Sequence, residues 1–98
     1  MNEHNFQKNT IKELKAAGWF VINISPIGNG NKGIPDLICC PPGGKFVAME
    51  LKVPGNSTTP AQKINLKKIA RNGGEAVTVY SEEEVRNIIK KHKRRSKL

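Results

Sequence analysis

Apolar residues recur along the chain with two different spacings, which predict helices near both ends and strands between them. Phe6, Leu14 and Ala17 recur at helical spacing before Gly18, so we expect a helix over 5–17 that ends in a glycine cap. A second helical pattern follows Thr59, and a third follows the Ser81 capping box. Short apolar runs typical of strands cover 19–25, 37–40, 46–53 and 76–80.

These elements follow one another in the order αβββαβα. Strands interleaved with helices in this way predict an α/β domain with a mixed central sheet flanked by helices. With 98 residues, of which 37% are hydrophobic, the chain has material for one domain and one modest core. We assign this domain to residues 1–89.

The second helix has the clearest boundaries. Thr59 suits the N-cap, Pro60 suits the first helical position, and Gln62 stands where a capping box closes back on the cap. The glycine pair after Asn72 ends the helix. The inner face of this helix is expected to hold Leu66, Ile69 and Ala70.

Three charged residues interrupt the two central strands. Asp36 opens one apolar run, and Glu50 and Lys52 lie near the end of the next. A charge in a half-buried strand costs several kcal/mol unless it is paired or binds a metal, so these positions need an explanation. Residues two apart share a face of a strand, and a hairpin through 41–44 would bring Asp36 onto the face of Glu50 and Lys52.

Two converging carboxylates with an ammonium beside them suit metal-assisted hydrolysis of a phosphodiester. Carboxylate oxygens are typical ligands of Mg²⁺ and Mn²⁺, and such ions acidify a bound water and neutralise developing charge. Lys52 could position or deprotonate that water or stabilise the pentavalent phosphate. A salt bridge at a sheet edge is the alternative explanation of a Glu-x-Lys pattern.

The order and spacing of several short motifs resemble those of the VRR-NUC domains within the PD-(D/E)XK nuclease superfamily. The likeness extends from about Phe6 to Ile89. The motifs that carry it are Ser25-Pro26, Gly33-Ile34-Pro35-Asp36-Leu37, Met49-Glu50-Leu51-Lys52 and Thr59-Pro60-Ala61-Gln62.

This resemblance implies a restriction-endonuclease-like fold and a Mg²⁺- or Mn²⁺-dependent DNA endonuclease. Asp36, Glu50 and the backbone carbonyl of Leu51 would bind the metal, and Lys52 would position or activate the attacking water. The resemblance to the small phage members of the family also implies a homodimer that acts on branched DNA, such as four-way junctions or flaps. We therefore expect DNA as a partner and a homodimer as the working form.

The sequence departs from the family pattern in its first helix, where an acidic residue completes the metal site. The matching position here is Gln7, and Glu3, one turn earlier, is the possible substitute. Lys32 stands where the family often has an arginine, without the bidentate fork of that side chain. The family also has a glutamine near the metal at the place of Gln62, so capping and active-site support both remain open for it.

The charge distribution favours an anionic partner. The net charge is +9, and six of the 17 basic residues lie in the tail 90–98, which holds no acid. This tail is either a solvated end or a phosphate clamp, and the basic face of the second helix could flank DNA. The residues expected to contact nucleic acid are Lys32, Lys63, Lys67, Lys90, Lys91, Arg94 and Arg95.

The chain contains neither a membrane-length apolar run nor a signal peptide pattern, and Cys39 and Cys40 are adjacent, which disfavours a disulfide or a zinc site. We expect an intracellular protein, cytoplasmic in a bacterium or phage-infected cell and nuclear in a eukaryotic host. Two other functions stay open. Gln7 favours a catalytically weak or inactive nuclease fold that only binds nucleic acid, and paired charges would favour a structural or partner-binding domain.

Overall fold

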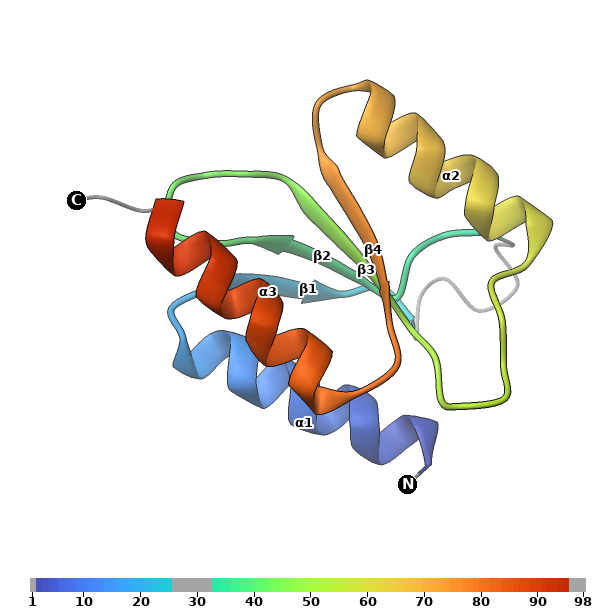
Figure 1. Ribbon diagram of the computed structural model, residues 1–98, viewed down its shortest axis with the longest axis horizontal. Coiled ribbons are helices and arrows are strands. Elements are labelled where there is room, and N and C mark those ends of the chain that lie inside the picture. Colours follow the sequence, from blue (N-terminus) through green and yellow to red (C-terminus); the bar gives the residue numbers. More distant parts are fainter. Residues whose placement is uncertain (1, 26–32, 96–98) are drawn as a thin grey trace.

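The computed structural model describes residues 2–25 and 33–95, which fold into a central sheet flanked by helices (Figure 1). The observed order αβββαβα confirms the predicted α/β class and the mixed sheet. Within the described residues the elements are α1 (Glu3–Ala16), β1 (Phe20–Asn23), β2 (Leu37–Cys40), β3 (Val47–Leu51), α2 (Pro60–Arg71), β4 (Glu75–Val79) and α3 (Glu82–Arg95).

The strands lie side by side in the order β1-β2-β3-β4. β2 is antiparallel to both of its neighbours, β1 and β3, and β4 returns parallel to β3 after the crossover through α2. In the β2–β3 hairpin Leu37 pairs with Met49. Continuing this register by one residue places Asp36 across from Glu50, as the hairpin hypothesis requires.

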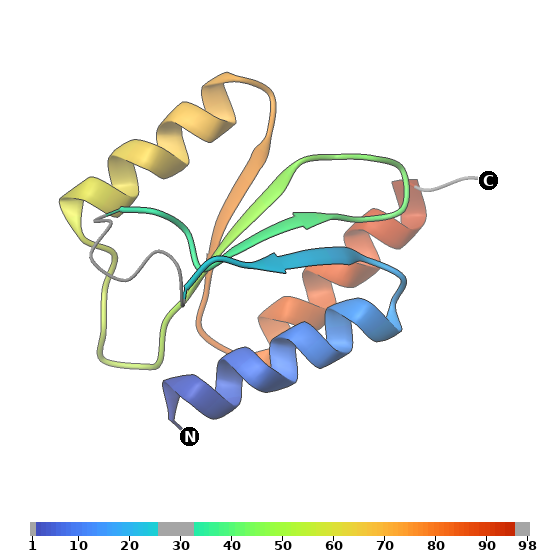
Figure 2. The ribbon, with the colours of Figure 1, turned by 180° about the vertical axis from the view of Figure 1, so that it is seen from behind.

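The main core lies between the sheet and the helix pair formed by α1 and α3. These two helices lie side by side, on the side of the sheet away from α2 (Figure 2). β3 is buried on both faces, and alternate residues of it join the core with Phe6 and Leu14 of α1. The central strand therefore holds Glu50, at its other face, inside the protein.

α2 packs less deeply than its sequence pattern predicts. None of its residues is buried, so the expected buried face of Leu66, Ile69 and Ala70 is wrong: the first two are half-buried and Ala70 is exposed. The helix packs mainly on β4, at one edge of the sheet. Apolar side chains on the rest of that face consequently stay exposed, including Phe20 at 66% and Phe46 at 48%.

The segment expected to be a basic tail begins inside a helix. α3 continues to Arg95, and His92 within it is only 2% exposed. Its Nε2 lies 3.0 Å from Oε1 of Glu75, and its ring meets that of Trp19 edge to face, with centroids 5.2 Å apart. These contacts attach the end of α3 to Glu75 at the start of β4 and to Trp19 just before β1. Among the described residues, no helix combines the length and apolarity that crossing a membrane requires.

Candidate active site

The chain enters the site through Gly33, which packs tightly on α2. Its φ of +87° lies in the left-handed region, and its carbonyl accepts a 2.7 Å hydrogen bond from Nδ2 of Asn65. A Cβ at this position would lie 2.6 Å from that nitrogen and 2.7 Å from the carbonyl oxygen of Ala61. Only glycine fits this approach, which fixes the path of the chain just before Asp36.

Asp36 is held at the end of the β2–β3 hairpin by backbone contacts. Its Oδ2 accepts a 2.8 Å hydrogen bond from the backbone N–H of Leu51, and its carbonyl accepts one of 2.9 Å from the N–H of Ile24. The carboxylate is therefore oriented by β3, while one of its oxygens is left for another partner.

Glu50 lies beside Asp36 and is almost completely buried. The residue is 2% exposed, and no described residue pairs with its Oε2. Burial raises the pKa of Glu50 to about 8, and a hydrogen bond and charge repulsion from Asp36 act in the same direction. Lys52 lowers this pKa and Glu3 raises it further, so both charges act on the site. At neutral pH the Glu50 carboxyl therefore holds a proton for much of the time.

A cavity of about 330 Å³ opens next to Asp36, whereas the buried Glu50 is not among its lining residues. The N-terminal turns of α1 form one wall, since the helix begins at Glu3, where the side chain of Asn2 caps it, and not at Asn5. The lining residues are Glu3, His4, Gln7, Ser25, Asp36 and Leu51. The structure thus brings both first-helix candidates, Glu3 and Gln7, to the same cavity as Asp36.

Gln7 is oriented by Asn23, the last residue of β1, and by Ser25 just after the strand. Its Nε2 donates to Oδ1 of Asn23 and to Oγ of Ser25, whose hydroxyl in turn donates to Asn23. The amide nitrogen is thereby engaged, so the amide oxygen is the group available to a ligand. The site predicted from the sequence did not include His4 or Asn23. For His4, the one available signal in the sequence was its place next to Glu3. No sequence signal pointed to Asn23.

The remaining predicted residues lie in different places. Gln62 closes the expected capping box: its Oε1 accepts from the N–H of Thr59 at 2.8 Å, and its own N–H donates to Oγ1 of Thr59 at 3.2 Å. This confirms the capping role, while active-site support by Gln62 stays a prediction. Lys52 follows β3 and is half-buried, outside the residues that line the cavity.

The basic candidates for DNA contact are distributed over two helices. Lys63 and Lys67 are exposed on α2, and Lys90 is exposed on α3. Nζ of Lys91 lies 3.1 Å from Oε2 of Glu75, so this lysine is engaged in an ion pair. Arg94 and Arg95 belong to the last turn of α3, and Lys32 lies outside the described residues.

The donor set fits one hard divalent cation. Two carboxyl groups converge, one of them buried with an unpaired oxygen, and a bound cation would remove the penalty that holds a proton there. Over residues 2–25 and 33–95, no group of three or more histidine, cysteine or acidic side chains could hold a metal. Two further oxygen atoms could join the two carboxyl groups as ligands of the cation: the carbonyl oxygen of Leu51 and the amide oxygen of Gln7.

A comparison with protein families decides where the chain belongs. The sequence model of the VRR-NUC domain matches residues 4–83, which include Glu50, Asp36 and the whole of α2. The chain belongs to the VRR-NUC domain family. The same range covers both the hairpin that carries the carboxylates and most of the helix α1 that lines the cavity, so the VRR-NUC match includes the site except for Glu3.

Two further comparisons agree with membership in the VRR-NUC family. A solved structure described as "VRR_NUC domain" superposes with a TM-score of 0.76 and 26% sequence identity, over 90% of this chain and 94% of that one. "Putative nuclease p44" of Acyrthosiphon pisum secondary endosymbiont phage 1 is 26% identical over 84 residues, which are 85% of this chain and 87% of that protein. VRR-NUC membership and this phage relative support a nuclease, and a nuclease domain implies a DNA substrate.

Proposed function

We propose that this VRR-NUC domain is a Mg²⁺- or Mn²⁺-dependent endonuclease that hydrolyses phosphodiester bonds in branched DNA, such as four-way junctions or flaps. The observation that carries the proposal is the pair Asp36 and Glu50, two carboxyl groups brought together by the hairpin register, with Glu50 buried and its Oε2 unpaired among the described residues. Such an arrangement is costly for folding and useful for binding a cation.

In this mechanism Asp36 and Glu50 would hold the cation, with the carbonyl of Leu51 as a further ligand. When bound, the cation would supply charge neutralisation at the scissile phosphate and a more acidic water. Lys52 comes directly after β3, two residues after Glu50, and its charge acts on the Glu50 carboxyl. Its ammonium group positions the attacking water or stabilises the phosphate in the transition state. Gln7, oriented by Asn23 and Ser25, directs its amide oxygen to the site.

The DNA path follows the exposed basic residues. Lys63 and Lys67 on α2 and Lys90 on α3 contribute phosphate contacts, which supply affinity without reading sequence. We assign Lys32, Arg94 and Arg95 to the same role on their sequence positions. A homodimer supplies the two active sites that symmetric cleavage of a junction requires, because one small domain has one site.

A cleavage assay tests the proposal. Linear duplex, flapped and four-way DNA are incubated with the protein in Mg²⁺, in Mn²⁺ or in chelator, and products are resolved on denaturing gels. We expect cleavage of the branched substrates with either cation and none in chelator. Cleavage that persists in chelator would reject the metal mechanism.

A second function is favoured by one specific observation. The first-helix position that is acidic in the family is Gln7 here, and an amide lacks the charge that draws a cation. A nuclease fold that binds DNA without cutting it would explain this substitution. Binding of branched DNA with no cleavage in any cation would favour this second function.

A further inference from the structure

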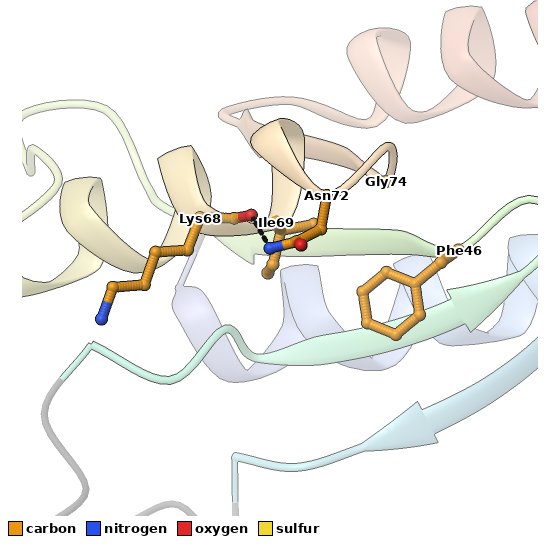
Figure 3. A pocket seen from close by; sticks show the side chains of 5 residues that line it. All are labelled: Phe46, Lys68, Ile69, Asn72 and Gly74. Carbon is orange, nitrogen blue, oxygen red and sulfur yellow. Dashed lines mark hydrogen bonds between the residues drawn. The ribbon is translucent and has the colours of Figure 1, made fainter.

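A second cavity, of about 320 Å³, lies between the C-terminal end of α2 and the start of β3 (Figure 3). Its walls are mostly apolar, and the phenyl ring of Phe46 stands at its mouth, 48% exposed. The lining residues are Phe46, Lys68, Ile69, Asn72 and Gly74. None of them lines the cavity beside Asp36, so the two cavities are separate.

One wall of the cavity depends on Gly74, where a side chain would not fit. A Cβ there would lie 2.8 Å from Cγ2 of Ile69 and 3.1 Å from Cδ1 of Phe46. The glycine lets the end of α2 approach the Phe46 ring closely, and the backbone bond from the N–H of Glu75 to the carbonyl of Phe46, at 2.9 Å, fixes this geometry. The backbone of this exposed aromatic residue is thereby fixed at the start of the inner strand β3.

The polar groups around the cavity are basic or uncharged. Nδ2 of Asn72 donates to the carbonyl of Lys68 at 2.7 Å, which leaves its amide oxygen on the side of the Phe46 ring (Figure 3). The Lys68 side chain extends away from the ring, along α2 toward its N-terminal end (Figure 3). The nearest acid in sequence, Glu75, is engaged by His92 and Lys91.

The cavity has a defined position relative to the carboxylates. Phe46 immediately precedes β3 and lies four residues before Glu50, so both side chains point to the same face of the sheet. Their separation along the strand is about 13 Å, which corresponds to roughly two to four nucleotides of a DNA strand, depending on how far it is extended. A strand with its scissile phosphate at Glu50 would thus reach Phe46.

We propose that this cavity binds an unpaired base of the DNA strand near the cleavage site, with Phe46 stacking on the base and Lys68 contacting a phosphate between the cavity and the carboxylates. This inference rests on the proposed nuclease function and narrows its substrate to DNA with unpaired nucleotides. Aromatic stacking combined with a basic groove is the usual mode of single-strand binding, and bases inside a duplex have no free face.

The basic residues beside this cavity favour DNA over a second copy of the chain as its occupant, and leave other surfaces free for the homodimer. The chain has a net charge of +9, and Lys68 and Arg71 on this end of α2 add to the positive field. Two such surfaces repel each other, whereas a DNA strand is attracted to them.

The test measures binding in chelator, so that it depends on neither metal nor cleavage. The probes are a fluorescent ten-nucleotide oligothymidylate and an abasic strand of the same length. Phe46→Leu should weaken binding of the oligothymidylate about fivefold or more and leave the abasic strand unaffected. Phe46→Tyr should keep the affinity, because it keeps the aromatic face. Lys68→Gln should weaken both probes, since each carries the phosphate.

Phe20→Leu is the matched control, because Phe20 is an exposed phenyl group on the same sheet but outside the cavity. It should change neither affinity. The proposal is overturned if Phe46→Leu weakens both probes equally or neither of them, or if Phe20→Leu has the same effect as Phe46→Leu. It is also overturned if Phe46→Leu converts a dimer to a monomer in light scattering with unchanged affinity. Thermal unfolding confirms that each variant is folded.

Discussion

The backbone N–H of Leu51 donates a 2.8 Å hydrogen bond to Oδ2 of Asp36 and so joins the start of β2 to the end of β3 in one site. The bond orients the Asp36 carboxylate with a rigid backbone group, beside the carboxyl group of Glu50 that it repels. A cation held by these two residues would therefore meet ligands that are already in place, at the cost of repulsion between them.

The first prediction concerns catalysis. Asp36→Asn and Glu50→Gln should each reduce cleavage of four-way DNA by about a hundredfold or more, because each removes a charged ligand. DNA binding should stay nearly unchanged, since it depends on lysine and arginine contacts to phosphate. Rates come from single-turnover gels and affinities from fluorescence anisotropy. Glu83→Gln, an exposed acid on α3, is the control. Full activity of Glu50→Gln would show that this carboxylate is not a ligand.

The second prediction links the pKa of Glu50 to stability without metal. Its pKa of about 8 lies above the ordinary value of 4.5, so the native state favours the neutral carboxyl. The stabilisation from Glu50 is full below the ordinary pKa and is lost as pH rises through the raised one. In chelator, Glu50→Gln should therefore gain stability relative to the parent as pH rises, on the order of 4 kcal/mol by pH 8.

Urea unfolding at several pH values measures this difference. Adding Mn²⁺ should reduce the advantage of Glu50→Gln, because the cation stabilises only the parent protein. Glu83→Gln again serves as the control and should show no such pH dependence. Equal stability of Glu50→Gln and the parent across the whole pH range would refute the raised pKa.

The third prediction concerns the first helix. Both Gln7 and Glu3 line the cavity of Asp36, so either could complete the cation site. Gln7→Glu should lower stability in chelator by repulsion and increase the affinity for Mg²⁺, and Glu3→Gln should reduce that affinity if Glu3 serves as the acid. Isothermal titration with the cation measures both. If neither variant alters cation affinity, α1 takes no part in binding it.

The fourth prediction tests the approach of Gly33 to α2. Gly33→Ala should destabilise the protein by roughly 2 to 4 kcal/mol, from the positive φ and the contacts with Asn65 and Ala61, and should reduce cleavage by displacing Asp36. Gly55 is the control: its φ is +98°, but a Cβ there would have no atom within 4 Å. Gly55→Ala therefore introduces the backbone strain without the close contacts. Chemical unfolding compares the two. Equal losses would mean that the tight contact is unimportant.

The fifth prediction separates the lysines by their partners. Lys90 is exposed, whereas Lys91 is paired with Glu75. On duplex arms, log affinity falls as log salt concentration rises. Lys63→Gln, Lys67→Gln and Lys90→Gln should each make this slope less steep by about 0.9, because each removes one phosphate contact. Lys91→Gln should change that slope less and lower stability instead. Anisotropy titrations at several salt concentrations measure the slopes, and identical slopes for Lys90→Gln and Lys91→Gln would contradict this division.

Local sequence signals determined much of this protein. Helix ends depend on short-range hydrogen bonds, so the spacing of Thr59 and Gln62 was sufficient to assign them to a capping box. The alternation of side chains along a strand and the short hairpin were sufficient to place Asp36 beside Glu50. The motif around these residues also led to the VRR-NUC family, which the family comparison confirms.

Burial was decided by the tertiary structure, because it depends on contacts between residues far apart in the chain. The apolar spacing of α2 predicts a buried face, yet the helix packs mainly on β4 and leaves Ala70 and the Phe46 ring exposed. His92 looks like part of a basic tail but is enclosed by Trp19 and Glu75. The proton on Glu50 likewise follows from burial beside Asp36, since desolvation and repulsion are set by three-dimensional distance and not by sequence spacing.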